Sequence, residues 1–122
     1  VEDEPAIRKM CARVLERLGY RVAVAAGPEE ALALVEAREA PVDLLLSDVI
    51  MPGLNGRELA ERLRTRCPGL RVLFMSGYDA DAVATRGVLE SGVHFIQKPF
   101  AMHALGPKLR EVLLQPPFPG GS

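Results

Sequence analysis

The sequence predicts an α/β fold, in which a parallel β-sheet is covered by helices on both faces. Three observations lead to this prediction. Short apolar runs alternate with amphipathic stretches of about ten residues along most of the chain. Two of these runs, 42–47 and 71–76, are apolar almost throughout, as in strands that are buried on both faces. Proline and glycine residues separate the segments and indicate turns between successive elements.

The helices are predicted from apolar residues that recur every three or four positions. The first covers 6–18, with Pro5 before it and Gly19 after it as start and stop signals. The second opens at Pro28 and ends before Pro41. The others are expected at 57–66, at 80–90 with a weaker pattern, and at 101–114.

The last of these helices contains a flaw, because Gly106 and Pro107 lie in its interior. A proline there removes a backbone hydrogen bond and clashes with the preceding turn, at a cost of about 3 kcal/mol. We therefore expect a kink, or a helix that starts again at Pro107.

Five strands are expected, ending near positions 2, 25, 47, 76 and 97. The second is the short β-prone run 21–25, and the last is 93–97. Because helices connect them, the strands are expected to run parallel with right-handed crossovers. The first strand is unusual, since only Val1 precedes the acidic residues Glu2 and Asp3. We expect that this strand is largely missing because the sequence begins late.

The composition of the 122 residues narrows the class of protein. With 48% apolar and 25% charged residues, the chain fits one domain over 1–114, followed by a disordered tail or linker at 115–122. A net charge of −1 argues against a broad nucleic-acid-binding surface. The first residues are not expected to form a signal peptide, and no apolar run is long enough to predict membrane insertion. Its two cysteines form neither a disulfide framework nor a zinc site, so a cytoplasmic location is expected.

Polar side chains stand where the predicted strands end. In parallel sheets these ends meet at one edge, where ligands bind. Three carboxylates placed close together repel one another unless a cation joins them, and Mg²⁺ prefers such oxygen ligands. An aspartate can accept a phosphoryl group, whose charge a metal, a lysine and a hydroxyl would stabilise. Singly, each residue is explained as a cap, a turn former or a solvated cation, but together they predict a site: Glu2, Asp3, Asp48, Ser76 and Lys98.

Four segments then carry a family resemblance: Val1–Pro5, Ser47–Gly56, Phe74–Tyr78 and Gln97–Phe100. In this order and spacing, the chain resembles the receiver domain of two-component response regulators up to about Leu114. It looks most like the receivers attached to hybrid sensor histidine kinases. The resemblance implies a flavodoxin-like, doubly wound, five-stranded parallel sheet of order 2-1-3-4-5. It also implies that the domain takes a phosphoryl group from a histidine kinase or phosphotransfer domain.

The resemblance implies a phosphoacceptor and a metal site. Asp48 would be phosphorylated and would also contact Mg²⁺. Asp3 would bind the metal directly, Glu2 would hold it through water, and the backbone carbonyl of Ile50 would be a further ligand.

The resemblance also implies a phosphoryl-binding and switch apparatus. Ser76, the amide of Gly77 and Lys98 would contact the phosphoryl group. The bond from Lys98 to Pro99 is expected to be cis. Ser76 and Phe95 would move together on phosphorylation and change the surface formed by the fourth helix, fifth strand and fifth helix, through which a homodimer could form. Without the resemblance, Phe95 would be read as a core residue.

Two alternatives remain open beside a phosphoaccepting receiver. A Mg²⁺-dependent phosphatase or phosphotransferase with an aspartyl-phosphate intermediate would carry a second Asp two residues after the nucleophile, where this chain has Ile50. A degenerate receiver that is not phosphorylated would follow if the first strand were truly absent. A flavodoxin-like cofactor binder is set aside, because Glu2, Asp3 and Glu4 would repel a phosphate. The chain is expected to catalyse only the phosphorylation and dephosphorylation of its own Asp48, and is not expected to be a conventional enzyme.

Overall fold

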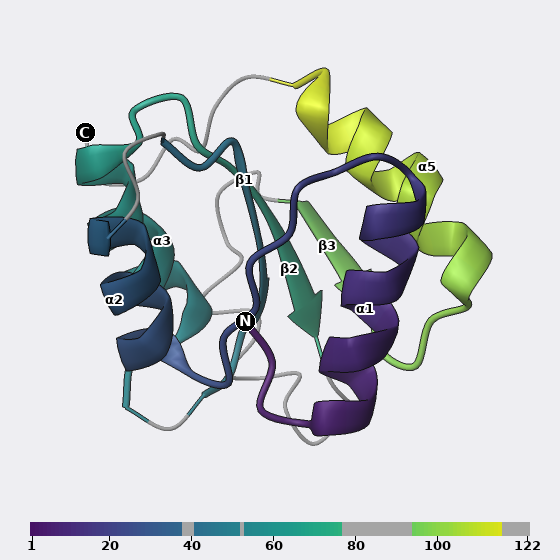
Figure 1. Ribbon diagram of the computed structural model, residues 1–122, viewed down its shortest axis with the longest axis horizontal. Helices are drawn as coiled ribbons and strands as arrows, with labels where there is room; N and C mark the ends of the chain where they lie inside the picture. The colour runs from purple at the N-terminus through teal and green to yellow at the C-terminus, as the bar shows by residue number, and fades with distance from the viewer. Residues whose placement is uncertain (38–40, 52, 77–93, 116–122) are drawn as a thin grey trace.

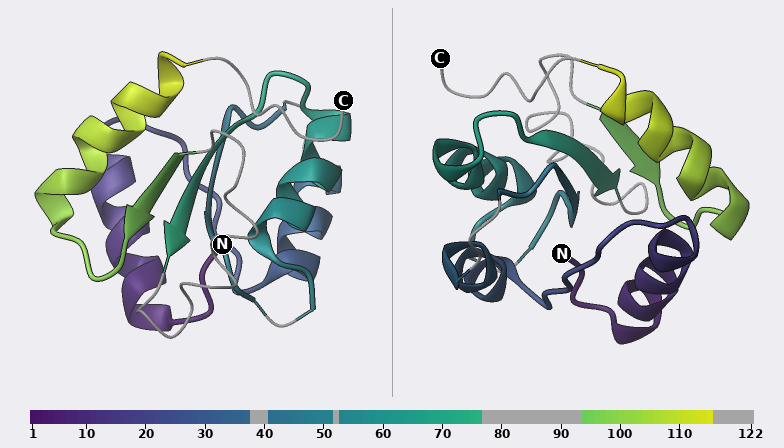
Figure 2. Two further views of the ribbon diagram at one scale, coloured as in Figure 1. Left: turned by 180° about the vertical axis from the view of Figure 1, so that it is seen from behind. Right: turned by 45° about the horizontal axis from the view of Figure 1, so that its top comes forward.

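A parallel sheet divides the molecule into two helical layers (Figure 1). The computed structural model describes residues 1–37, 41–51, 53–76 and 94–115. Within these ranges, one pair of helices covers each face of the sheet, and both views in Figure 2 show the same layering. The predictions of a helix at 80–90, of a role for Gly77 and of a tail beyond Gln115 lie outside the described residues.

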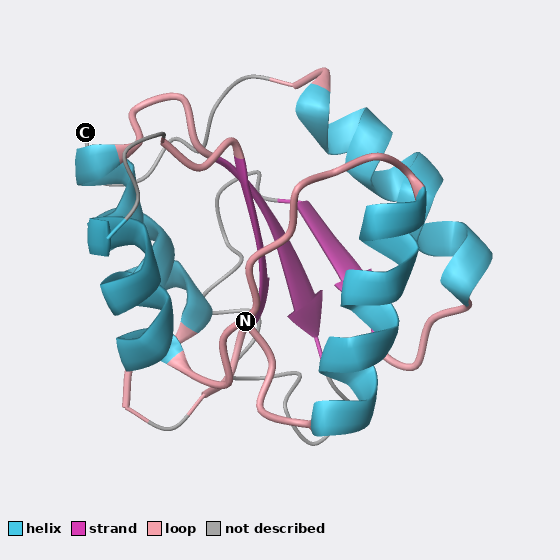
Figure 3. Cartoon of the chain, viewed as in Figure 1, coloured by secondary structure: helices cyan, strands magenta, loops and turns pink. Residues whose placement is uncertain are grey.

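The sheet contains three assigned strands in the order β1-β2-β3 (Figure 3). All pairs are parallel, so the carboxyl ends of the strands meet at one edge, as predicted. The register places Asp48 opposite Met75 and Ser76 opposite Gln97. The strands are β1 (Leu44–Asp48), β2 (Arg71–Ser76) and β3 (His94–Gln97).

Two apolar clusters hold the helices against the sheet. On one face, α1 (Pro5–Arg17) packs beside α5 (Met102–Leu113). On the other, α2 (Pro28–Ala37) packs beside α3 (Gly56–Arg66). β2 is buried along nearly its whole length, which matches its continuous apolar run. The bounds of α1, α3 and α5 agree with the predicted segments to within one residue, and α2 begins at the predicted Pro28.

The segment 21–25 does not form the predicted second strand, although it lies on the expected side of the sheet. Among the described residues, the one backbone hydrogen bond that joins it to the side of the sheet is donated by the N–H of Glu2 to the carbonyl of Ala25, at 3.1 Å. Val1 in turn pairs with β1, because the N–H of Asp48 donates to the Val1 carbonyl at 3.0 Å. The segments therefore lie in the predicted order, but only Val1 and Glu2 stand between 21–25 and β1. A strand needs a continuous partner, and two residues are too short to make a ladder.

α5 runs through Pro107 as one helix, so the predicted second start at Pro107 is wrong. Its buried face explains why, since Leu105 and Leu109 pack against the sheet and against α1 on both sides of the proline. Gly106 is itself buried, and a Cβ there would lie 3.1 Å from Leu18. Tertiary packing thus overrides the local cost of the proline.

Candidate phosphoacceptor site

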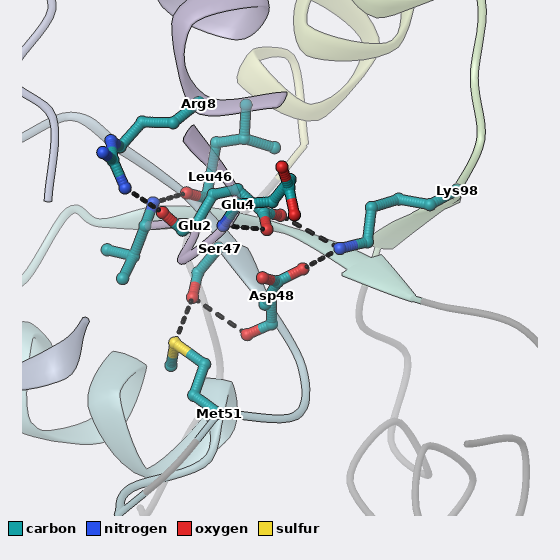
Figure 4. Close-up of polar contacts among 9 residues, drawn as sticks. Glu2, Glu4, Arg8, Leu46, Ser47, Asp48, Met51 and Lys98 are labelled. Carbon is teal, nitrogen blue, oxygen red and sulfur yellow. Dashed lines mark hydrogen bonds and ion pairs between the residues drawn. The ribbon is translucent and has the colours of Figure 1, made fainter. Parts of the chain in front are cut away.

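The carboxyl edge of the sheet brings predicted polar side chains together, and Figure 4 shows three of them, Glu2, Asp48 and Lys98. Asp48 is the last residue of β1, Ser76 is the last residue of β2, and Lys98 follows β3 directly. Glu2 reaches the same edge because Val1 pairs with β1. The parallel sheet therefore brings together residues that are separated by up to 96 positions in the sequence.

A buried ion-pair triad lies at the centre of this edge. The Nζ atom of Lys98 lies 2.7 Å from Asp48 Oδ1 and 3.0 Å from Glu2 Oε2 (Figure 4). Glu2 is only 2% exposed and Asp48 only 4%. At this burial, an unpaired charge is costly, so the lysine and the two carboxylates depend on one another.

The backbone fixes both sides of the triad. The N–H of Lys98 donates to the carbonyl of Ser76 at 2.7 Å, which ties the residue after β3 to the end of β2. The bond between Lys98 and Pro99 is cis, which confirms the prediction. On the other side, the N–H of Glu4 donates to Glu2 Oε1 at 3.0 Å, and Arg8 donates to the Glu2 carbonyl at 2.9 Å.

The electrostatics of the triad bring the pKa of one of its carboxyl groups close to neutral pH. Burial, followed by the neighbouring Glu2 carboxylate, raises the pKa of Asp48 to about 7, although Lys98 acts in the opposite direction. Burial would raise the pKa of Glu2, but hydrogen bonds with Asp48, the Glu4 N–H and Lys98 outweigh it and lower that pKa. The two carboxylates likewise raise the pKa of Lys98 against the effect of burial. Asp48 is therefore the group that ionises with difficulty in the absence of a further cation.

This arrangement predicts a pH-dependent effect of Asp48→Asn on stability. Because the folded-state pKa of Asp48 lies above its ordinary value of 3.8, ionising it costs folding free energy. That cost is absent below about pH 4, grows as the pH rises, and is complete above about pH 7. With divalent ions removed by a chelator, Asp48→Asn should therefore be more stable than the wild type by roughly 1–2 kcal/mol at pH 8. Urea unfolding at a series of pH values measures the difference.

The matched control is Asp43→Asn, at an exposed position just before β1. Its stability should stay within about 0.5 kcal/mol of that of the wild type. If the stability gain of Asp48→Asn were the same at pH 5 and pH 8, the raised pKa of Asp48 would not be its cause.

Three carboxylates at this edge could hold a divalent cation. Oxygen atoms of Glu2, Asp3 and Asp48 lie within 4.8 Å of one another. Asp3 is exposed, whereas the other two are buried, so the cluster opens to solvent on the side of Asp3. Such a set of hard oxygen donors fits Mg²⁺, which keeps several waters and uses few carboxylates.

The other predicted residues differ in their surroundings. Ser76 is buried at 7% exposure, close to the lysine backbone that it binds. Phe95 is 50% exposed, so its alternative interpretation as a core residue is wrong. The side chain of Ile50 is 43% exposed, and the predicted role of its carbonyl stays a prediction.

Three residues that support the site were not found from the sequence. Ser47 Oγ donates to the carbonyl of Asp48 at 2.9 Å and contacts the sulfur of Met51. Arg8 holds the Glu2 carbonyl, and Gly56 donates its N–H to the carbonyl of Val49 at 2.7 Å. Gly56 follows Asn55, whose side chain begins α3 in a capping box with Glu58. The capping pattern was a readable signal for the helix start, but nothing local shows that Gly56 lies against Asp48.

Comparison with known proteins identifies the family. The family model for the response regulator receiver domain matches residues 1–110. The chain belongs to this family. The family match and the similar solved structures confirm the fold class and the domain function expected from the sequence motifs. Receiver domains interact with histidine kinases or phosphotransfer proteins.

Several relatives show how far the similarity reaches. The receiver is 38% identical to the sensor kinase CckA of Brucella abortus over 93% of the chain, which is 12% of CckA. It is 30% identical to the response regulator receiver protein CpdR of the same organism, over 93% of the chain and 92% of CpdR. The chemotaxis protein CheY4 of Vibrio cholerae matches with a TM-score of 0.75 and 28% identity, covering 91% of the chain and 92% of CheY4.

The receiver covers only part of most of these curated relatives. It spans 47% and 49% of two regulators that match at 30% and 37% identity, compared with 12% of CckA. In the described part of the chain, no helix has the length and apolar character needed to cross a membrane.

Proposed function

We propose that this receiver accepts one phosphoryl group on Asp48 from a histidine kinase or phosphotransfer domain. The observation that supports the proposal is the triad, in which Lys98 contacts the buried Asp48 at the carboxyl end of β1, beside two further carboxylates. A carboxylate oxygen of Asp48 would attack phosphorus, forming a P–O bond while the bond to the donor's histidine nitrogen breaks. The donor imidazole takes the electron pair of the broken P–N bond and leaves as a neutral ring, because its other ring nitrogen already carries a proton.

The residues around Asp48 suit the separate tasks of this reaction. Asp3, Glu2, Asp48 and the Ile50 carbonyl would hold Mg²⁺, which supplies positive charge for the transferring phosphoryl oxygens. Lys98 would favour the ionised, nucleophilic form of Asp48, because its ammonium group lies 2.7 Å from Oδ1 and acts against the effect of burial on the pKa of that carboxyl.

Phosphorylation would change the conformation of residues at the end of β2 and on the neighbouring strand β3. Ser76 and the amide of Gly77 would bind phosphoryl oxygens, with Ser76 one residue beyond the partner of Asp48 in the sheet register. Phe95, half exposed on β3, would then change its packing and alter the surface formed with α5. That surface would contact the downstream partner or a second receiver. The 38% identity to part of a sensor kinase supports a place in a hybrid kinase.

Mass spectrometry of the intact protein tests the phosphoacceptor. Incubation with acetyl phosphate and Mg²⁺ should add the mass of one phosphoryl group to the wild type. Asp48→Asn should remain unmodified, and a chelator should prevent modification of the wild type, because the metal is needed to offset the oxygen charges.

Asp43→Asn again serves as the control, since Asp43 is exposed and directly precedes β1, the strand that ends at Asp48. It should be phosphorylated like the wild type. Modification of Asp48→Asn would assign the phosphoacceptor to another residue. A wild type that stays unmodified under all conditions would be a degenerate receiver, and repeated turnover of small phosphate esters would indicate a phosphatase.

A further inference from the structure

Ser47 places a hydroxyl group in the apolar interior of the receiver. Its side chain is 0% exposed, and it lies on β1 opposite Phe74, which is equally buried. Leu45 shares this face of the strand and packs in the apolar cluster on the side of α3. Taking a hydroxyl out of water costs free energy unless it forms a hydrogen bond, so the partner of Ser47 indicates what the hydroxyl does there.

That partner is the backbone of the phosphoacceptor. The Ser47 hydroxyl donates its one hydrogen to the carbonyl of Asp48 at 2.9 Å, whereas the Met51 sulfur lies 3.8 Å away and is a weak acceptor (Figure 4). In the described part of the chain, no backbone N–H donates to this carbonyl. β2 cannot supply one, because Val49 bonds to the Met75 carbonyl and successive residues of a strand bond to opposite sides. Without Ser47, the Asp48 carbonyl would lose its donor.

The same carbonyl is held on a second side by the start of α3. A Cβ atom at Gly56 would overlap the Asp48 carbonyl oxygen, so the two backbones are in direct contact. The next residue is fixed as well, since the Val49 N–H bonds to Met75 at 3.0 Å and the Val49 carbonyl accepts from Gly56 at 2.7 Å. Among these hydrogen bonds, the one from Ser47 is made by a side chain, so a substitution can remove it and leave the backbone intact.

The direction of the Asp48 carbonyl sets how the chain leaves β1. This carbonyl belongs to the peptide plane that joins Asp48 to Val49, and Ile50 follows one residue later. Rotation of that plane would move the Ile50 carbonyl relative to the Asp48 carboxylate. Both oxygen groups belong to the set proposed above for Mg²⁺, which demands near-octahedral geometry. A donor that fixes the plane would therefore keep the two groups in place for one ion.

We propose that Ser47 is a positioning residue for the phosphoacceptor, whose hydroxyl holds the Asp48 carbonyl so that the Asp48 carboxylate and the Ile50 carbonyl face the same Mg²⁺ ion. The inference rests on the proposed function of this site, but it concerns metal binding before any phosphoryl transfer. Hydrogen bonds that orient the ligands of a metal are typically worth about ten- to a hundredfold in metal affinity. If Ser47 only filled space, Mg²⁺ affinity would not depend on its hydroxyl.

A Mg²⁺ titration of the unphosphorylated receiver and three variants tests the proposal. Ser47→Thr and Ser47→Val are a matched pair, since both are β-branched, have nearly the same shape and differ in the hydroxyl. Ser47→Ala removes the hydroxyl without adding volume. The amide signals of Asp3 and Ile50 in NMR spectra report binding, and urea unfolding establishes that each variant is folded at the titration temperature.

The expected result is a loss of Mg²⁺ affinity that follows the hydroxyl. Ser47→Val and Ser47→Ala should bind Mg²⁺ at least about tenfold more weakly than the wild type, whereas Ser47→Thr should stay within about threefold of it. Equal affinities of Ser47→Thr and Ser47→Val would overturn the proposal. Wild-type affinity in Ser47→Ala would also overturn it, because the hydroxyl would then serve only the packing of β1.

Phosphorylation by acetyl phosphate separates this inference from the proposed function. In the variants without the hydroxyl, the rate at limiting Mg²⁺ should fall at least about tenfold and should recover as Mg²⁺ saturates the site. A wild type that binds Mg²⁺ in a hydroxyl-dependent manner but takes up no phosphoryl group would overturn the proposed function and support the positioning role. Phosphorylation of the wild type, together with equal Mg²⁺ affinities of Ser47→Thr and Ser47→Val, would overturn the positioning role alone.

Discussion

Replacing Gly56 with alanine is expected to destabilise the receiver by about 3 kcal/mol or more. A Cβ atom at this position would lie 2.3 Å from the carbonyl oxygen of Asp48 and 3.0 Å from the ring of Phe74. The first contact is with backbone and cannot be relieved by a side-chain rotation. Either α3 or the end of β1 must move, and the Gly56 N–H bond to the Val49 carbonyl would be strained with it. Urea unfolding of the purified variant measures the loss.

The same substitution should also weaken phosphorylation, because the displaced carbonyl belongs to the phosphoacceptor proposed here. Gly69→Ala is the matched control, since a Cβ there would have no neighbour within 4 Å. That variant should stay within about 0.5 kcal/mol of the wild type. Equal stability of Gly56→Ala and Gly69→Ala would show that the chain relaxes around Gly56 without cost.

Replacing Lys98 with methionine is expected to destabilise the metal-free receiver by about 2–4 kcal/mol at pH 8. Methionine keeps the apolar stem but leaves Glu2 and Asp48 as two buried carboxylates without their cation. The loss should shrink toward pH 5, because Asp48, with a pKa of about 7, is then protonated and one of the two charges disappears. Urea unfolding at the two pH values in the presence of a chelator provides the measurement.

Two further measurements, the addition of Mg²⁺ and a surface lysine variant, test whether the lost charge of Lys98 causes this destabilisation. Millimolar Mg²⁺ should restore part of the stability of Lys98→Met, since a cation among Glu2, Asp3 and Asp48 replaces the missing charge. Lys108→Met is the control, because Lys108 pairs with the exposed Glu111 at 3.5 Å on the outside of α5. Its effect should stay below about 0.5 kcal/mol. A loss for Lys98→Met that is the same at both pH values and insensitive to Mg²⁺ would assign Lys98 a packing role only.

Much of the candidate site could be predicted from the sequence because of a general property of parallel sheets. Asp48, Ser76 and Lys98 each stand at the end of an apolar run, and such ends must meet at one edge. The identity of the strands was readable because β2 is apolar almost throughout. The cis bond before Pro99 came from the family resemblance and is confirmed.

Other features escaped the sequence because they arise from contacts between distant segments. The strand expected at 21–25 did not form, since a ladder needs a partner and only Glu2 reaches Ala25. The second start expected at Pro107 did not occur, because Leu105 and Leu109 anchor α5 on both sides of the proline. Periodicity and propensity describe one segment at a time, so they predict neither the lack of a strand partner nor the packing that holds α5 together.

By itself, the sequence determined the parallel α/β architecture, the family and the set of residues that meet at the carboxyl edge. It did so because apolar runs, helix periodicity and strand-end motifs are local patterns. Only the tertiary structure decided that Lys98 bridges Glu2 and Asp48, and that Gly56 must lie against the Asp48 carbonyl. These features depend on distances between residues far apart in the chain, which packing sets and no local pattern records.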